Sequence, residues 1–229
     1  MLRRLHIDIW HPRLGLACMS AITVLAGPIL FILVTTLLGV LQPDYNPIYK
    51  TVSALVWGRY GWMQTIIFIL FGFLMCIFVL RLWVTFQNKS VTLNAGTLLL
   101  LLNGAGFFII AIFPTQPEGI HRLVHMYTAE MMALLFTIAL FLLLPSLRVL
   151  STWKTIYIYT LITAIISLSL IIMGAFIALE APWVGLYERI FLLNGFIWLE
   201  VISVRLLKSC LLQTRRNKEQ VNSGACFPD

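Results

Sequence analysis

Six long apolar runs alternate with short polar segments along the chain. Each run is long enough to cross the roughly 30 Å hydrocarbon core of a bilayer as a helix. The runs cover about 14–41, 62–86, 92–113, 121–147, 154–179 and 186–212. We therefore predict an all-α polytopic membrane protein in which a bundle of six transmembrane helices spans residues 14–212. A cytoplasmic interfacial segment, 1–13, and a disordered cytoplasmic tail, 213–229, are expected to flank this domain.

Composition and charge agree with this class of protein. Hydrophobic residues make up 60% of the chain and charged residues only 11%, whereas a soluble domain carries about 25% charged residues. The positive-inside rule places both termini in the cytoplasm, because twelve of the sixteen Lys and Arg residues fall on one side of the predicted spans. They are Arg3, Arg4, Arg13, Arg81, Lys89, Arg148, Lys154, Arg205, Lys208, Arg215, Arg216 and Lys218. Since these residues gather at the ends of apolar runs, the net charge of +7 does not indicate nucleic-acid binding.

The connection between the third and fourth runs carries an acid and two histidines. At about 100° per residue, His121 and His125 lie about 40° apart on one helical face, and Glu118 falls on the same face. Two such imidazoles could share a metal ion, but no third ligand is evident and the four cysteines show no paired metal-ligand spacing. We expect no metal or other cofactor; His121 and His125 are the residues that would hold a metal. Thr115 and Glu118 also match a capping box, in which the glutamate bonds the Thr115 amide.

The first and third outer connections are polar as well. In the first, Asn46-Pro47 is a turn signal and predicts a short helix with Asn46 as its N-cap. Ser53 follows, and its hydroxyl either lines a pocket or satisfies backbone groups. In the third, Glu188 and Arg189 open the sixth run. Arg189 needs an acceptor, so it is either clamped to span one, two or four or it recognises an anionic group of a ligand.

Several short motifs occur in order along the chain: Tyr45-Asn46-Pro47-Ile48, Thr51-Val52-Ser53-Ala54-Leu55, Gly61-Trp62, Phe113-Pro114, His125 and Gly185-Leu186-Tyr187-Glu188-Arg189. Together they resemble a prokaryotic family of membrane proteins known as domain of unknown function 998. The resemblance implies a six-span architecture, a multi-pass location in the prokaryotic plasma membrane, and a site near the outer connections. It implies no activity. Two positions depart from the family pattern, since Tyr49 stands in place of a small hydroxyl residue and Gln116 in place of an aspartate.

The leading functional hypothesis is an integral membrane protein whose outward-facing polar pocket binds or transports a small molecule or lipid. A cavity that reaches past Glu130 toward Asn103 or Asn194 would favour transport. The alternatives are a membrane-embedded, metal-dependent hydrolase acting on a lipid at the outer leaflet, and a structural or interaction protein without a ligand. Membrane lipids are the expected partners, and the oligomeric state is left open. The candidate ligand-binding residues are Asn46, Ser53, His121, His125, Glu130, Glu188 and Arg189.

Overall fold

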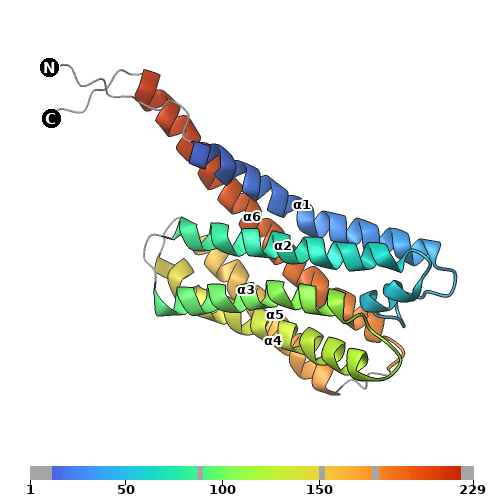
Figure 1. Cartoon of the computed structure of the whole chain (residues 1–229). Coiled ribbons are helices and arrows are strands. Elements are labelled where there is room, and N and C mark those ends of the chain that lie inside the picture. The colour runs from blue at the N-terminus through green and yellow to red at the C-terminus, as the bar shows by residue number, and fades with distance from the viewer. Residues whose placement is uncertain (1–11, 87–89, 150–152, 177–180, 223–229) are drawn as a thin grey trace.

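The computed structural model describes residues 12–86, 90–149, 153–176 and 181–222. Within these ranges every regular element is helical (Figure 1). Each of the six α-helices contains a stretch that is long and apolar enough to cross a membrane, so the predicted all-α architecture of six transmembrane helices is confirmed. The elements are α1 (Pro12–Leu41), the 3₁₀-helix η1 (Val52–Trp57), α2 (Gly61–Thr85), α3 (Val91–Ile112), α4 (Ile120–Val149), α5 (Lys154–Phe176) and α6 (Val184–Asn222).

The helices begin and end close to the predicted runs, except at the C-terminal end of the chain. α1 begins at Pro12, and residues 1–11 of the predicted interfacial segment lie outside the described residues. α6 continues to Asn222, so the segment predicted as a disordered tail begins as helix. Its Gln, Arg, Lys and Glu residues are good helix formers. A helix that is already formed in the membrane can therefore continue beyond it, because only the first turn is costly to nucleate.

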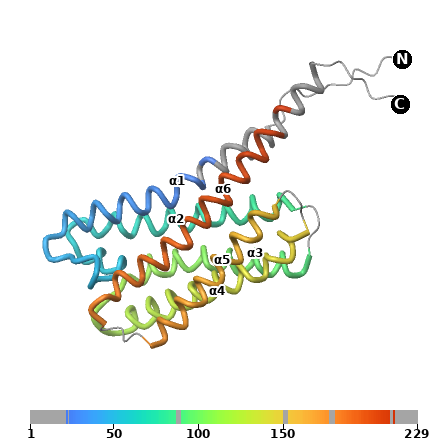
Figure 2. Tube along the Cα trace, turned by 180° about the vertical axis from the view of Figure 1, so that it is seen from behind, coloured from blue at the N-terminus to red at the C-terminus, as the bar shows by residue number. Residues whose placement is uncertain are grey.

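The six helices form a ring in which each helix packs against the next one in the sequence, and α6 packs back against α1. α6 crosses the bundle obliquely, and its C-terminal part extends beyond the other helices alongside the start of α1 (Figures 1 and 2). Within the described ranges the backbones of α4 and α6 are not in direct contact. The interior between these two helices must therefore hold side chains, a cavity, or both.

Aromatic rings occupy the centre of the ring of helices. Phe31, Phe71, Phe107 and Phe196 come from four different helices. Phe71 and Phe107 have ring centroids 4.8 Å apart, and Phe196 lies 5.0 Å from both Phe31 and Phe71. Trp198, further along α6, has no exposed surface. These phenylalanine rings pack against one another in the interior of the bundle. We call the end of the bundle that carries residues 42–60, 113–119 and 181–183 the loop end.

Candidate ligand cavity and the connection that frames it

The first connection at the loop end, residues 42–60, is docked against the start of α6. The backbone N–H of Leu186 donates to the Ile48 carbonyl at 3.0 Å. Gly185 permits this approach, because a Cβ at that position would lie 2.2 Å from the Lys50 carbonyl oxygen and 2.7 Å from that of Pro47. The glycine that opens the sixth span is therefore required by the close contact of two backbones.

Arg189 completes the docking one turn further along α6. Its Nη1 donates to the backbone carbonyls of Pro47 (2.7 Å), Lys50 (3.0 Å) and Gly185 (2.9 Å). Its Nη2 donates to the hydroxyl of Tyr45. The sequence indicated that this arginine needs an acceptor, and the structure supplies four uncharged ones. Two carbonyls of the turn, one carbonyl of α6 and the Tyr45 hydroxyl thus accept from the two terminal nitrogens of the planar guanidinium.

Tyr45 links Arg189 to the rest of the first connection. Its hydroxyl accepts from the guanidinium and donates to the Thr51 carbonyl at 2.9 Å. Burial raises the pKa of Tyr45 above its ordinary value, so the phenol keeps the proton that this second bond requires. The arginine also lies over the tyrosine ring, with Cζ 5.6 Å from the ring centroid.

Glu188 holds the other end of the same segment. Its Oε2 accepts from the backbone N–H of Val52 at 2.6 Å. This N–H belongs to the first residue of η1 and has no acceptor within its own helix, so a carboxylate from α6 caps η1. Glu188 and Arg189 therefore both tie α6 to the first connection, rather than to span one, two or four as expected.

The short helix predicted to begin at Pro47 is absent at that position. Asn46 instead opens a turn, in which the N–H of Lys50 donates to the Asn46 carbonyl at 2.9 Å. The helical segment comes later, as η1. The reason is the docking itself: the carbonyls of Pro47 and Lys50 face Arg189, so they cannot serve as acceptors for a continuing helix.

The capping box predicted between Thr115 and Glu118 is wrong as well. α4 begins at Ile120, so Glu118 precedes the helix instead of occupying its third position. Gly119 lies between Glu118 and the first residue of α4, and its φ of 89° is a left-handed conformation that favours glycine. The Thr115 carbonyl accepts from Trp57 Nε1 at 2.7 Å, which joins the first and second connections.

A cavity of about 640 Å³ lies inside the ring of helices at the loop end. Its volume falls within the range of about 300–1,000 Å³ that is typical of small-molecule sites. Most of its wall is apolar and includes Phe31, Phe68, Phe71, Phe107, Phe136, Phe191, Phe196, Met75, Met126 and Met132. The polar residues of the wall include Thr51, Ser53, Asn103, His125, Glu130 and Glu188. They come from η1 and the residue before it, α3, α4 and α6.

His125 and Asn103 are buried in this wall and are each held by a backbone carbonyl. Nδ1 of His125 lies 2.9 Å from the Phe113 carbonyl oxygen. A carbonyl can only accept, so in the neutral ring Nδ1 carries the proton and Nε2 does not. Nδ2 of Asn103 donates to the Met132 carbonyl at 2.7 Å. Both side chains are thereby fixed in orientation.

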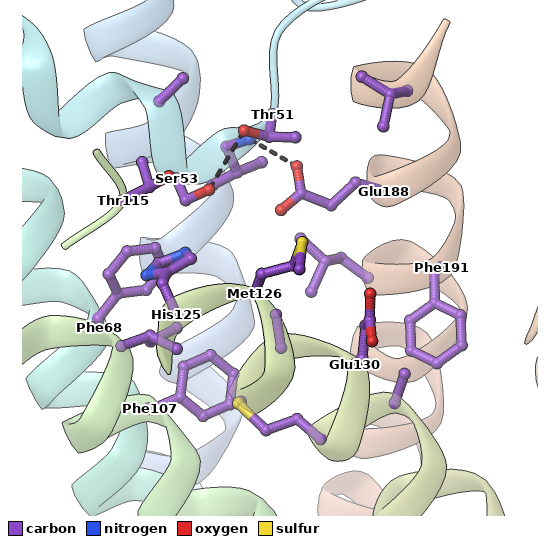
Figure 3. A pocket seen from close by; sticks show the side chains of 18 of the residues that line it. Thr51, Ser53, Phe68, Phe107, Thr115, His125, Met126, Glu130, Glu188 and Phe191 are labelled. Carbon is purple, nitrogen blue, oxygen red and sulfur yellow. Dashed lines mark hydrogen bonds between the residues drawn. The ribbon is translucent and has the colours of Figure 1, made fainter. Parts of the chain in front are cut away.

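Glu130 differs from these two residues in having no such contact. It projects into the cavity from α4, beside Phe191 of α6 (Figure 3). It lies about 15 Å along the helix axis from Ile120, at about 1.5 Å per residue, and so near the middle of the span. Among the residues that the structure describes, no hydrogen bond or salt bridge to its carboxylate is present.

The structure divides the predicted site residues into two groups. Ser53, His125, Glu130 and Glu188 line the cavity. Asn46, His121 and Arg189 do not line it. Asn46 is exposed and its Oδ1 accepts from the N–H of Ile48 at 2.9 Å. The His121 ring lies against Phe113 with a centroid distance of 5.3 Å, and Arg189 is engaged in the docking of the first connection.

Several polar residues of the cavity wall were not in the predicted ligand-binding set, among them Asn103 and Thr51. The sequence signal for Asn103 is an amide inside an apolar run. The signal for Thr51 is weaker, since it only precedes Ser53 by two positions in the same polar connection; in the structure the two hydroxyls are 3.2 Å apart. Tyr49 and Gln116, where the chain departs from the family pattern, also line the cavity.

No group of three or more His, Cys, Asp or Glu side chains that could hold a metal ion occurs in the described part of the chain. The two histidines also lie in different surroundings, since His125 lines the cavity and His121 does not. The hypothesis of a metal-dependent hydrolase therefore finds no ligand set among these residues.

A family model described as "Protein of unknown function (DUF998)" matches residues 25–205. The matched region runs from α1 to α6 and includes both motifs that dock against each other at the loop end. No curated protein and no solved structure matches the chain.

Proposed function

We propose that this chain, which belongs to the DUF998 family of proteins of unknown function, binds or transports a small molecule or lipid in the cavity at the loop end. The observation that carries this proposal is the cavity itself, whose wall includes both Glu130 of α4 and Asn103 of α3 inside their membrane spans. Protein interiors are normally packed with few voids larger than a water molecule. An interior space of about 640 Å³ is therefore unexpected in a protein whose only role is structural.

The composition of the wall favours an amphiphilic ligand. Phenylalanine and methionine side chains supply an apolar surface, His125 and Asn103 supply polar groups of fixed orientation, and Glu130 supplies a carboxylate. Ligand sites usually combine these two kinds of residue, because apolar contacts give affinity and a few polar groups fix the orientation of the ligand. Binding to an interior site is also consistent with a protein that meets its ligand in or at a membrane.

A cavity-filling variant tests the proposal directly. Ala133 lines the cavity on α4, and Ala133→Phe should occupy space that a ligand needs. Ala175→Phe on α5 is the matched control, because Ala175 is exposed and does not line the cavity. Native mass spectrometry of protein purified in mild detergent should detect a bound small molecule or lipid on the wild type and on Ala175→Phe. Equal occupancy of that adduct on a folded Ala133→Phe variant would refute the proposal.

We also propose that the loop end faces away from the cytoplasm, in a multi-pass protein of the plasma membrane. The distribution of Lys and Arg supports this orientation. Glu118 is a suitable reporter position, because it is exposed and precedes α4. In intact cells, Glu118→Cys should react with a membrane-impermeant thiol reagent, whereas a tag on either terminus should stay protected. Protection of the cysteine together with access to the tags would reverse the orientation.

A further inference from the structure

We infer that the cavity recognises an organic cation carried on an apolar body, with Glu130 as its counter-charge. The inference rests on the proposed function and adds the chemical class of the ligand. It draws on three observations: the unpaired carboxylate in the cavity, the placement of the other charges around it, and the aromatic rings beside it.

Glu130 is a carboxylate of the cavity wall without a partner among the described residues. The other carboxylate in the wall, Glu188, already accepts the Val52 N–H at 2.6 Å and precedes Arg189 directly in the sequence. Glu130 has no hydrogen bond or salt bridge among the described residues. An ionised side chain near the middle of a membrane span is costly without a partner. A cation in the cavity would supply that partner.

Among the described residues, two basic ones line the cavity, Lys50 in the first connection and Arg122 in the first turn of α4. Both are exposed. Lys50 Nζ donates to the Asp44 carbonyl at 2.7 Å, and Arg122 Nη1 donates to the Pro117 carbonyl at 2.8 Å. Both bases are therefore held by backbone carbonyls of their own connections, and within the described residues no ion pair joins either of them to Glu130.

The rings around Glu130 suit the same ligand. Phe191 lies beside it in the cavity wall, Met126 lies between it and η1, and Phe107 lines the same cavity farther from Glu130 (Figure 3). The face of an aromatic ring is negative and attracts cations, and cages of such rings recognise quaternary ammonium groups. An anionic ligand placed here would meet both a carboxylate and negative ring faces, and a neutral one would leave the charge of Glu130 unbalanced.

Two probes of the same shape and opposite charge test this inference. Tetraphenylphosphonium and tetraphenylborate can each be measured by equilibrium binding to the full-length protein in nanodiscs, with empty nanodiscs as background. The cation should bind the wild type at least about tenfold more tightly than the anion, which corresponds to about 1.4 kcal/mol. Glu130→Gln should remove most of this preference. Glu118→Gln should keep it, because Glu118 is exposed outside the cavity.

The outcomes separate this inference from the proposed function. If both probes bind equally and Ala133→Phe weakens both, the cavity binds ligands but the preference for a cation is refuted. If Ala133→Phe affects neither probe, both proposals fail. The wild-type comparison needs no substitution, so the test holds even if Glu130→Gln does not fold. Competition by a choline lipid in the nanodisc, compared with a soluble quaternary amine, tells whether the cation comes from a lipid headgroup or from solution.

Discussion

The docked first connection and the cavity next to it contain similar polar residues that are satisfied to very different degrees. In the docked connection, Arg189 uses four acceptors and Glu188 caps the N–H of Val52. In the cavity, Glu130 has no partner within the described residues. The two regions share a wall, since Glu188 takes part in the docking and also lines the cavity.

This difference distinguishes polar residues that hold the fold together from polar residues that remain available to a ligand. Polar groups whose bonds are all made within the protein stabilise the fold and have little left to offer a ligand. A carboxylate that stays unpaired deep in a membrane protein lowers stability, so it is expected to persist only where it serves another purpose. The comparison predicts that substitutions in the docked connection change stability strongly, whereas substitutions in the cavity change it little and affect binding instead.

The largest effect is expected from Gly185→Ala in the docked connection. The new Cβ would lie 2.2 Å from the Lys50 carbonyl oxygen, which is a backbone atom already held by Arg189. Overpacking of this kind costs typically about 1–3 kcal/mol and occasionally more, and we expect a loss at the top of that range. Gly195→Ala on the same helix is the control, since its nearest neighbour is the Phe136 ring at 3.5 Å. Equal thermal unfolding temperatures for the two variants would contradict the docking geometry.

The next largest effect is expected from Arg189→Ala. The substitution strands the carbonyls of Pro47 and Lys50 and should lower the free energy of unfolding by about 1.5–3 kcal/mol, the usual contribution of hydrogen bonds to a charged group. Arg122→Ala should cost much less, because Arg122 is exposed and donates one bond, to Pro117. Unfolding by titration with a denaturing detergent measures both. A variant with normal stability but no binding would make Arg189 a ligand residue.

The helices of this protein were predictable from sequence, but the docking was not. Long apolar runs determine membrane spans because an unpaired backbone cannot cross hydrocarbon. The docking instead joins residues as far apart as Pro47 and Arg189, 142 positions from each other. Its acceptors are mainly backbone carbonyls, which every residue carries and no side-chain pattern reveals. The sequence therefore showed that Arg189 needs acceptors without showing which ones.

The cavity was only partly predictable, for a related reason. The i, i+4 spacing places His121 and His125 on one face, but it does not say how the helix is rotated within the bundle. The structure turns His125 into the cavity, and His121 does not line it. The apolar residues of the wall gave no signal at all, because phenylalanine and methionine in a span face lipid, core or cavity with the same sequence pattern.

Asn103 provides an intermediate case. Its Nδ2 donates to the Met132 carbonyl, so Asn103→Ala should cost about 0.6–1.7 kcal/mol, the range of hydrogen bonds between membrane helices. Asn194→Ala should cost a similar amount, because its Nδ2 donates to Ser167 Oγ at 2.8 Å. Only Asn103 lines the cavity, so only its variant should also change binding of tetraphenylphosphonium. Equal effects of both variants on binding would show that the cavity is not where the probe resides.

The smallest effect on stability is expected from Glu130→Gln. The side chain makes no bond that the amide would lose, so the free energy of unfolding should change by no more than about 0.5 kcal/mol. A gain in stability is the expected direction, because removing the charge removes the cost of holding it in a largely apolar wall. Glu188→Gln is the matched comparison: its amide oxygen can still accept from Val52, but a charge-assisted bond is roughly twice as strong as a neutral one. It should therefore be the less stable of the two variants. If Glu130→Gln loses as much stability as Glu188→Gln, then the Glu130 carboxylate makes stabilising bonds within the protein and is not available to a cation.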